Sequence, residues 1–305
     1  MGRKPKSAGR EISGILLLDK PAGMTSNQVL QYIKKIFQAR KAGHTGSLDK
    51  LATGLLPICL GEATKFSAFL LNADKCYLAT ITLGTTTTTG DTAGEILRTQ
   101  PVTEISRNTI KQILEQFTGR IQQTPPMYSA LKHKGQRLYK LAYQGKEVAR
   151  DPREVTVHEL ELLRAGGNEI ELRITCSKGT YIRTLAEDIG EKLGCGAHIR
   201  ELRRIAAGPF TTDGMVTVTD VEQAESGGFP ALDRLLQSMD GILSGLPPVY
   251  LHDNLMFYLR QGQAVIVPKS PVAGMVRIYD DAERFQGIGE VLDDGRISPR
   301  RLVHA

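Results

Sequence analysis

The sequence predicts a mixed α/β protein with a smaller, β-rich C-terminal part. Residues 154–164 and 168–177 have the pattern of two strands, and the Gly-Gly-Asn sequence at 166–168 favours a tight antiparallel turn between them. A helical pattern follows at 180–193 and ends at a glycine. Residues 250–305 contain short β-like runs, so we expect them to form a separate small β domain.

The first part of the chain predicts further strands and helices in alternation. The apolar run at 12–18 is typical of a buried strand, and Thr25 or Ser26 can cap a helix that continues to about residue 37. Residues 198–206 fit a strand or a helix equally well. The other elements that we expect are a helix near 62–71, a strand at 75–83, a polar turn at 85–91 and a helix at 106–117.

Length and composition exclude several classes of protein. The 305 residues are 41% hydrophobic and 24% charged, which is ordinary for a soluble globular chain of one or two domains. The apolar run at 15–18 is too short for a signal sequence or a membrane span. The cysteines show no CxxC spacing and the histidines no metal-binding pattern, so we expect free thiols in a reducing cytoplasm and no metal site.

Positive charge is concentrated in one segment. The chain has a net charge of +6, which favours a polyanionic partner. Residues 120–153 hold eight Lys or Arg against two acidic residues, a surplus equal to that of the whole chain. Tyrosines are interleaved with these cations, a combination that suits phosphate contact and base stacking. A solvated surface helix would show a similar charge pattern.

A single carboxylate, Asp49, lies in a glycine-rich segment that favours a tightly bent loop. Gly43, Gly46 and Gly54 permit backbone shapes that are closed to other residues, and the apolar run at 55–60 should anchor the loop in a core. An acidic side chain on a shaped, anchored loop suits nucleophilic or general-base chemistry. The alternative is an aspartate that only caps a turn.

The sequence SKGTYIR at 177–183 offers two side chains that could meet Asp49. It joins a strand to a helix, and such turns commonly carry sites because the first amides of the helix are free. Tyr181 and Arg183 could both reach a neighbouring loop, and an arginine beside Asp49 would orient the carboxylate and favour its ionised form. Arg183 could instead pair with Glu187, one turn along the helix.

Tyr77 and His44 are weaker candidates on residue chemistry alone. Tyr77 falls in the strand at 75–83, where an interior tyrosine usually belongs to the core and has its hydroxyl satisfied. His44 precedes Asp49 by five residues and should lie near the surface of the same loop. An exposed histidine most often takes no part in a site.

Four motifs in this order and spacing resemble one known family. They are LDKPAGMTS at 18–26, GHTGSLDKLATGLLPICLGEATK at 43–65, PPMYSALK at 125–132 and CSKGTYIRTL at 176–185. Together they resemble the bacterial TruB family of tRNA pseudouridine-55 synthases over roughly residues 12–250. The resemblance implies the pseudouridine synthase fold, with a mixed, mainly antiparallel central sheet and flanking helices. It is also compatible with a small PUA-like β domain at the C-terminus.

The resemblance implies a reaction and a division of the chain. Members isomerise a uridine in the T-arm of tRNA, detaching a flipped uracil from C1′ and rejoining it through C5, without a cofactor or a metal. The implied partner is the T-arm of tRNA, with no membrane and no required protein partner, and we expect a monomer in the cytoplasm. The implied parts are a basic disordered tail at 1–10, a catalytic domain at 11–249 with an RNA-binding insertion at about 120–153, and a PUA-like domain at 250–305.

The resemblance also assigns roles to single residues. Asp49 matches the catalytic aspartate, which attacks C1′ or assists sugar deprotonation after glycosidic cleavage; the sequence leaves both routes open. The other matches are Tyr77, which stacks on the uracil; Tyr181, a second site tyrosine; Arg183, which pairs with the aspartate; His44, which enters the T-loop in place of the extruded base; Leu202, in the apolar wall; and Lys20, at the border of the cleft.

The sequence is also compatible with two alternative functions. The same basic surface would serve a tRNA-binding or tRNA-folding module in which modification is secondary. A guide-RNA-directed relative would share the catalytic core, but such enzymes lack a comparable insertion and rely on partner proteins. The segment at 120–153 therefore favours an enzyme that acts alone.

Overall fold

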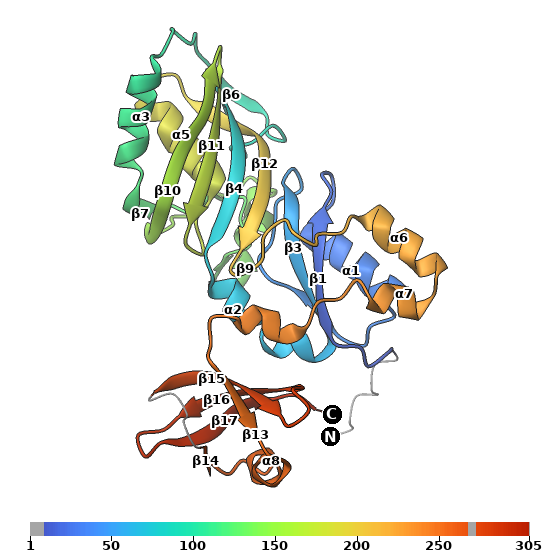
Figure 1. Ribbon diagram of the computed structural model, residues 1–305. Coiled ribbons are helices and arrows are strands. Elements are labelled where there is room, and N and C mark those ends of the chain that lie inside the picture. The colour runs from blue at the N-terminus through green and yellow to red at the C-terminus, as the bar shows by residue number, and fades with distance from the viewer. Residues whose placement is uncertain (1–8, 268–272, 305) are drawn as a thin grey trace.

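One long sheet organises most of the molecule, which is described here from a computed structural model covering residues 9–267 and 273–304 (Figure 1). Its strands, in spatial order, are β1 (Gly14–Lys20), β3 (Thr53–Leu60), β12 (Ala197–Ala207), β4 (Lys75–Leu83), β11 (Glu169–Cys176), β10 (Arg153–Gly166) and β7 (Gly119–Gln123), and β2 (Ala42–His44) pairs with β3. The mixed, mainly antiparallel sheet with flanking helices confirms the predicted fold class.

The sheet has a narrow seam in its middle, between β3 and β12. These two strands pair in parallel through only Thr53 with Arg203 and Gly54 with Arg204, whereas all the other neighbours in this sheet are antiparallel. Gly54 has φ +94°, and a Cβ there would come within 2.2 Å of the Arg204 carbonyl oxygen. Only glycine permits this approach, so the seam depends on it.

Helices cover the two halves of the sheet separately (Figure 1). The β1–β3 half is covered by α1 (Ser26–Ile36), α6 (Val218–Ser226) and α7 (Phe229–Asp233), and the larger half by α3 (Arg107–Gln116) and α5 (Ile182–Lys192). Thr25 begins α1 with a capping box that includes Gln28, and Val29 and Ile33 point into the core. Both faces of β1 are buried, which explains its continuous apolar sequence.

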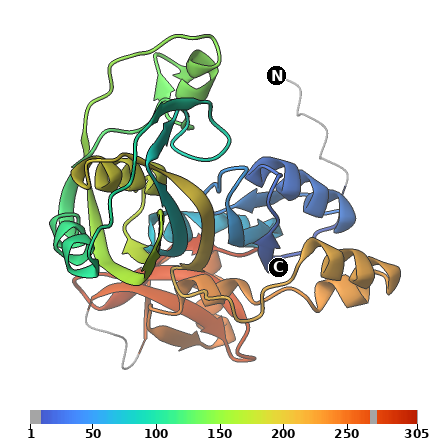
Figure 2. The same ribbon diagram turned by 90° about the horizontal axis from the view of Figure 1, so that it is seen from above.

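Two segments extend from the large half of the sheet. The first is a short hairpin formed by the antiparallel strands β5 (Thr85–Thr87) and β6 (Ile96–Thr99). The chain between β7 and β10 forms β8 (Lys132–His133), β9 (Gln136–Arg137) and α4 (Leu138–Ala142), and it projects away from the body of the molecule (Figure 2).

The C-terminal part forms a second sheet with the order β13-β15-β16-β17-β14. Its elements are β13 (Pro248–Leu251), α8 (Asp253–Arg260), β14 (Val265–Ile266), β15 (Gly274–Asp280), β16 (Phe285–Val291) and β17 (Arg296–Leu302), and the turn η2 (Met239–Leu243) precedes them. This sheet lies below the long sheet in Figure 1 and has its own small core around Leu259, Val276 and Ile278.

The two sheets are joined by a shared apolar cluster and by hydrogen bonds. Phe66 packs edge-on against Phe285 with ring centroids 5.4 Å apart. Lys65 Nζ donates to the Leu302 carbonyl at 2.8 Å, and Arg301 Nη1 donates to the Lys65 carbonyl at 2.7 Å. Strand β17 is therefore fixed to the turn η1 (Gly61–Lys65), which directly follows β3.

Several local expectations differ from the structure. The helix predicted near 62–71 is divided into η1 and α2 (Ser67–Asn72), because Phe66 between them has ψ near 0°. Residues 198–206, which fitted two patterns, form strand β12, and the polar turn at 85–91 begins with β5. The hairpin partner β6, the helix α8 and the strand β17 were not anticipated.

Residues 1–8 of the predicted tail lie outside the described residues, but Arg10 is held by Asp233 at 2.6 Å and by the ring of Phe229. All four cysteines are free; Cys76 is half-buried and the others are buried. In the described part of the chain, no helix is long and apolar enough to cross a membrane.

Candidate active site

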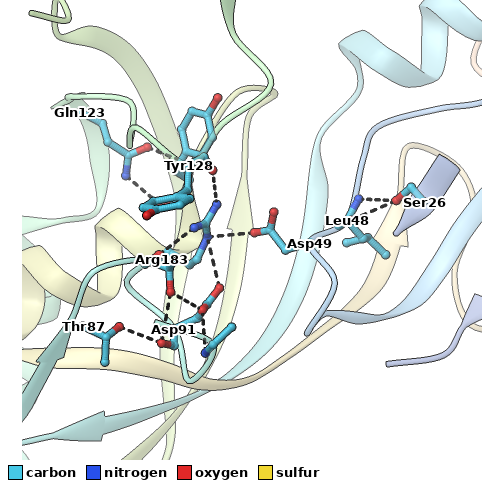
Figure 3. A network of polar contacts seen from close by, with 11 residues as sticks. Ser26, Leu48, Asp49, Thr87, Asp91, Gln123, Tyr128 and Arg183 are labelled. Carbon is cyan, nitrogen blue, oxygen red and sulfur yellow. Dashed lines mark hydrogen bonds and ion pairs between the residues drawn. The ribbon is translucent and has the colours of Figure 1, made fainter. Parts of the chain in front are cut away.

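The loop at residues 45–52 carries Asp49 and is tied down on both sides of it. Leu48 N donates to Ser26 Oγ at 2.8 Å, and the same hydroxyl donates to the Leu48 carbonyl at 3.1 Å (Figure 3). On the other side, Ala52 N donates to the Asp49 carbonyl at 3.1 Å. Because Ser26 is buried in the first turn of α1, this helix fixes the position of the carboxylate.

Arg183, in the first turn of α5, reaches Asp49 from the other half of the sheet. Its Nε lies 2.9 Å from Asp49 Oδ2, while Nη1 donates to the Thr89 carbonyl at 2.7 Å and Nη2 to the Tyr128 carbonyl at 2.8 Å (Figure 3). The Arg183 side chain is 6% exposed and that of Asp49 is 47% exposed. A buried cation thus orients a carboxylate that is still open to solvent.

Asp91 completes this charged group, and it was not predicted as a site residue. Its Oδ2 lies 3.9 Å from Arg183 Nε, and its Oδ1 accepts from Thr89 Oγ1 at 2.6 Å and from Ala93 N at 3.0 Å. In the described part of the chain, the ion pairs of Arg183 within 4.0 Å are with Asp49 and Asp91, not with Glu187. The available sequence signal was a single acid within a run of threonines and glycines, and the structure shows that its side chain is 7% exposed.

The two tyrosines approach this group from neighbouring strands and loops. Tyr181 precedes α5, and its backbone makes two hydrogen bonds with the Gln123 side chain. Tyr181 N donates to Gln123 Oε1 at 2.7 Å, and Gln123 Nε2 donates to the Tyr181 carbonyl at 3.0 Å. Tyr77 lies in β4 and packs half-buried against the main core. Burial raises the pKa of both hydroxyls above the ordinary tyrosine value, so both stay protonated at neutral pH.

Lys20 and Leu202 are more deeply buried than a position at the border of a cleft suggests. Lys20 ends β1 with no exposed surface, and its Nζ donates to the carbonyls of Pro21 at 2.8 Å and Met24 at 2.6 Å. Burial lowers the pKa of this amine to about 8, although the nearby charge of Asp49 raises it. Leu202 is 7% exposed in β12 and belongs to the main core.

His44 lies at the end of β2, directly before the Asp49 loop, and it is half-buried rather than exposed. Its Nδ1 is buried without a hydrogen-bond partner in the described structure. Burial lowers the pKa of the imidazole, and the charge of Arg204 acts in the same direction, so His44 is neutral at physiological pH.

Comparison with known proteins identifies the family. TruB family pseudouridylate synthase (N terminal domain) matches residues 34–182, tRNA pseudouridylate synthase B C-terminal domain matches 183–244, and Pseudouridine synthase II TruB, C-terminal, matches 247–303. The tRNA pseudouridine synthase B of Nitrosococcus oceani is 53% identical over 99% of this chain and 98% of its own length. This chain belongs to the TruB family. The family expected from the four sequence motifs is confirmed.

Other relatives and solved structures agree with this membership of the TruB family. The tRNA pseudouridine synthase B of Pseudomonas putida is 55% identical over 98% of both chains. A structure of an H/ACA RNP bound to a substrate RNA containing 2′-deoxyuridine superimposes with a TM-score of 0.73 at 26% identity, covering 100% of this chain and 92% of that one. A Cbf5-Nop10-Gar1 complex gives 0.72 at 28% identity, with coverages of 95% and 84%.

Burial and neighbouring charges act in opposite directions on the pKa of Asp49 in this TruB family chain. Desolvation by the surrounding protein raises the pKa of the carboxyl above its ordinary value, and the Arg183 guanidinium opposes that rise. The neighbouring charge of Asp91 adds to the rise, and that of Lys20 opposes it. The direct contact with Arg183 and the 47% exposure of the Asp49 side chain both favour the ionised form.

Arg204 is a second residue that sequence reasoning missed. Its side chain is almost fully buried at 1% exposure, under the Asp49 loop. Its Nε donates to the Leu55 carbonyl at 2.7 Å, and its Nη2 donates to the Gly46 carbonyl at 3.1 Å. The sequence around it fitted a strand and a helix equally well, so the face on which this arginine lies could not be assigned.

The site is a carboxylate held by arginine at the seam of the sheet. Asp49 belongs to the β1–β3 half, whereas Arg183, Tyr77 and Tyr181 belong to the larger half. Among residues 9–267 and 273–304, no group of three or more His, Cys, Asp or Glu side chains is arranged to hold a metal ion. An oriented, partly exposed carboxylate can act as a nucleophile or as a general base.

Proposed function

We propose that this chain is a tRNA pseudouridine synthase that converts uridine 55 in the T-loop of tRNA to pseudouridine, with Asp49 as its catalytic residue. The observation that carries the proposal is the exposed Asp49 carboxylate oriented by buried Arg183, in a chain of the TruB family. The relatives named tRNA pseudouridine synthase B match it over nearly its whole length.

The proposed reaction is an isomerisation in which nothing is added to the uridine. The bond between N1 and C1′ breaks, a bond between C5 and C1′ forms, C5 loses a proton and N1 gains one. Asp49 serves either by attack at C1′ or by taking a proton from the sugar after glycosidic cleavage, and its geometry suits both routes. Arg183 holds the carboxylate in place, and the ring of Tyr77 stacks on the flipped uracil.

The remaining residues and segments fit the same proposal. His44 replaces the extruded base within the T-loop, Tyr181 and Leu202 line the pocket, and Lys20 supports its border. The insertion at 120–153 grips the T-arm through its exposed cations. We assign residues 11–249 to the catalytic domain and 250–305 to the PUA-like domain, in a monomer that works in the cytoplasm.

Release of tritium from tRNA labelled at C5 of uridine tests this function. Purified wild-type protein, without guide RNA or protein partners, should release tritium, and the product should map to position 55. Asp49→Asn should bind tRNA normally and lower the rate by at least about a thousandfold, because the group that makes or breaks bonds is lost. Full isomerisation by Asp49→Asn would overturn the assignment.

The same two proteins address the tRNA-folding alternative. In a refolding assay with unmodified tRNA, Asp49→Asn should match the wild type if folding depends on binding alone. Failure of both proteins in this assay would dismiss the folding role. No tritium release by the wild type, with tRNA still tightly bound, would replace the enzyme assignment with an RNA-binding one.

A further inference from the structure

Arg204 occupies the narrow seam between the two halves of the long sheet. Its backbone pairs with Gly54, one of only two residue pairs that join β12 to β3. Its guanidinium then crosses to the β3 side and donates to the carbonyls of Gly46 and Leu55. Gly46 precedes Asp49 in the loop and Leu55 follows it in β3, so one side chain ties the start of the loop to the strand that comes after it.

The same side chain lies close to other elements of the site. Arg204 is the register partner of Tyr77 on β4, and its charge acts on the Tyr77 hydroxyl and on the His44 imidazole. A Cβ added at Gly46 would lie 3.4 Å from Arg204 Nη1. Arg204 is thus packed between the loop that carries Asp49 and the strand that carries Tyr77.

The burial of this cation is costly and is not offset by an acid. Arg204 and the neighbouring Lys20 and Lys75 are all buried, and in the described part of the chain no carboxylate lies within 4.0 Å of any of them. A buried charge without an ionic partner lowers stability, and a well-packed apolar residue often serves stability as well or better. The contacts of Arg204 therefore point to a geometric role.

We propose that Arg204 is a positioning residue, which fixes the Asp49 loop against β4 and so sets the separation between Asp49 and Tyr77. This inference rests on the proposed function. The two halves of the sheet meet here in only two backbone pairs, so the side-chain hydrogen bonds of Arg204 add to a sparse connection. The planar guanidinium carries donors on separate nitrogens in a rigid fork, so its Nε and Nη2 reach two different carbonyls. Lysine donates from one nitrogen on a flexible stem and does not reproduce this fixed spacing.

Arg204→Lys tests the proposal because it keeps the positive charge but removes the guanidinium, whose separate nitrogens donate to two carbonyls. We expect the single-turnover rate on tRNA to fall by about 10–100-fold, since a displacement near 1 Å costs this much, while the Kd for tRNA stays within about threefold. The matched control is Arg173→Lys on β11, whose exposed guanidinium pairs with Glu161. It should keep the wild-type rate and affinity.

A second measurement does not depend on activity. Amide hydrogen exchange should become faster at residues 45–52 in Arg204→Lys, with the C-terminal sheet unchanged, because the tie to Gly46 is lost. If the proposed function fails, the wild type releases no tritium, but this change in exchange still appears. If Arg204→Lys does not fold, Arg204→Gln is measured in the same way below its Tm.

The two measurements separate positioning from a purely structural role. A purely structural residue would lower the Tm and the folded fraction, but the folded molecules would keep the wild-type rate. That result, or wild-type exchange at residues 45–52 in a folded variant, would overturn the proposal. A slow rate in fully folded protein, together with faster exchange in the loop, would support it.

Discussion

The Asp49 site and the insertion at 120–153 use positive charge in opposite ways. Arg183 and Arg204 are buried, and their donors are engaged by carbonyl groups or by a carboxylate. Lys132, Lys134 and Lys140 in the insertion are exposed on short elements that project from the body. The difference indicates that the first set holds protein atoms in place, whereas the second set is available to an outside polyanion.

One residue connects the two regions. Arg183 Nη2 donates to the carbonyl of Tyr128, which lies within the insertion, while its Nε holds Asp49. If the insertion moves when RNA binds, Arg183 would therefore transmit that movement from the Tyr128 carbonyl to the Asp49 carboxylate. This connection makes the comparison testable: changes in the buried set should alter the rate, and changes in the exposed set should alter affinity.

Among changes in the residues around Asp49, Arg183→Lys should have the largest effect on the rate. A lysine cannot contact Asp49, Thr89 and Tyr128 together, so both the orientation of the carboxylate and the tie to the insertion are lost. We expect single-turnover tritium release to fall by about 100–1,000-fold, comparable to the loss of a fixed electrostatic contact in other active sites. A rate close to the wild type would mean that Arg183 has only a packing role.

Asp91→Asn should have a smaller but clear effect on the rate. The amide oxygen can still accept from Thr89 and Ala93, so the loop should keep its shape, but the charge beside Arg183 is removed. We expect a loss of about 10–100-fold in single-turnover rate with little change in tRNA affinity. Asp74→Asn, at an exposed acid near His158, is the control and should behave as the wild type.

Replacing Lys132, Lys134 and Lys140 together by alanine should act on affinity instead. Each lost phosphate contact weakens binding, so we expect the KM for tRNA to rise about tenfold while kcat is unchanged. In a salt titration, the slope of log Kd against log salt concentration should fall by about 2–3. A loss of kcat instead would place these lysines with the buried set.

The control for this triple variant uses exposed arginines that already have acidic partners. Arg164, Arg173 and Arg200 pair with glutamates on the large half of the sheet, far along the strands from the insertion. Their replacement by alanine should leave the salt dependence of tRNA binding unchanged. An equal loss of affinity would show that overall charge matters rather than the insertion.

The smallest effect concerns Glu187, which lies one turn after Arg183 on α5. Desolvation raises its pKa from 4.5 to about 7, so the folded state opposes its ionisation more than the unfolded state does. The penalty is absent below pH 4.5 and complete above pH 7. Glu187→Gln should therefore gain stability over the wild type as pH rises, by about 1–2 kcal/mol after allowance for partial exposure, in urea unfolding at pH 4.5 and pH 8. An equal difference at both pH values would contradict this.

The sequence was informative where the cause is local. Alternation identified β4, and the Gly-Gly-Asn turn identified the hairpin of β10 and β11. A Thr or Ser before an amphipathic run identified the start of α1. It was uninformative where a residue depends on distant partners. Arg204 is buried only because β12 meets β3 across the seam, and Asp91 is a site residue only because its loop packs against α5.

The site residues taken from the resemblance show the same limit. Arg183 does contact Asp49, as residue chemistry and the resemblance both suggested. The surroundings of His44 and Lys20 were not foreseen, because burial depends on the whole fold rather than on the neighbouring residues. Their roles toward RNA stay predictions.

The contact of β17 with η1 has a consequence for how such chains can be recombined. Phe66 has no exposed surface, and Phe285 of the C-terminal sheet covers part of it. The Lys65 side chain donates to the Leu302 carbonyl, and the Arg301 side chain donates to the Lys65 carbonyl. A C-terminal domain borrowed from a distant relative would meet an unmatched surface at residues 61–66. We expect a viable chimera to exchange η1 and Phe66 together with that domain, so these sequence-distant segments should be inherited as a unit.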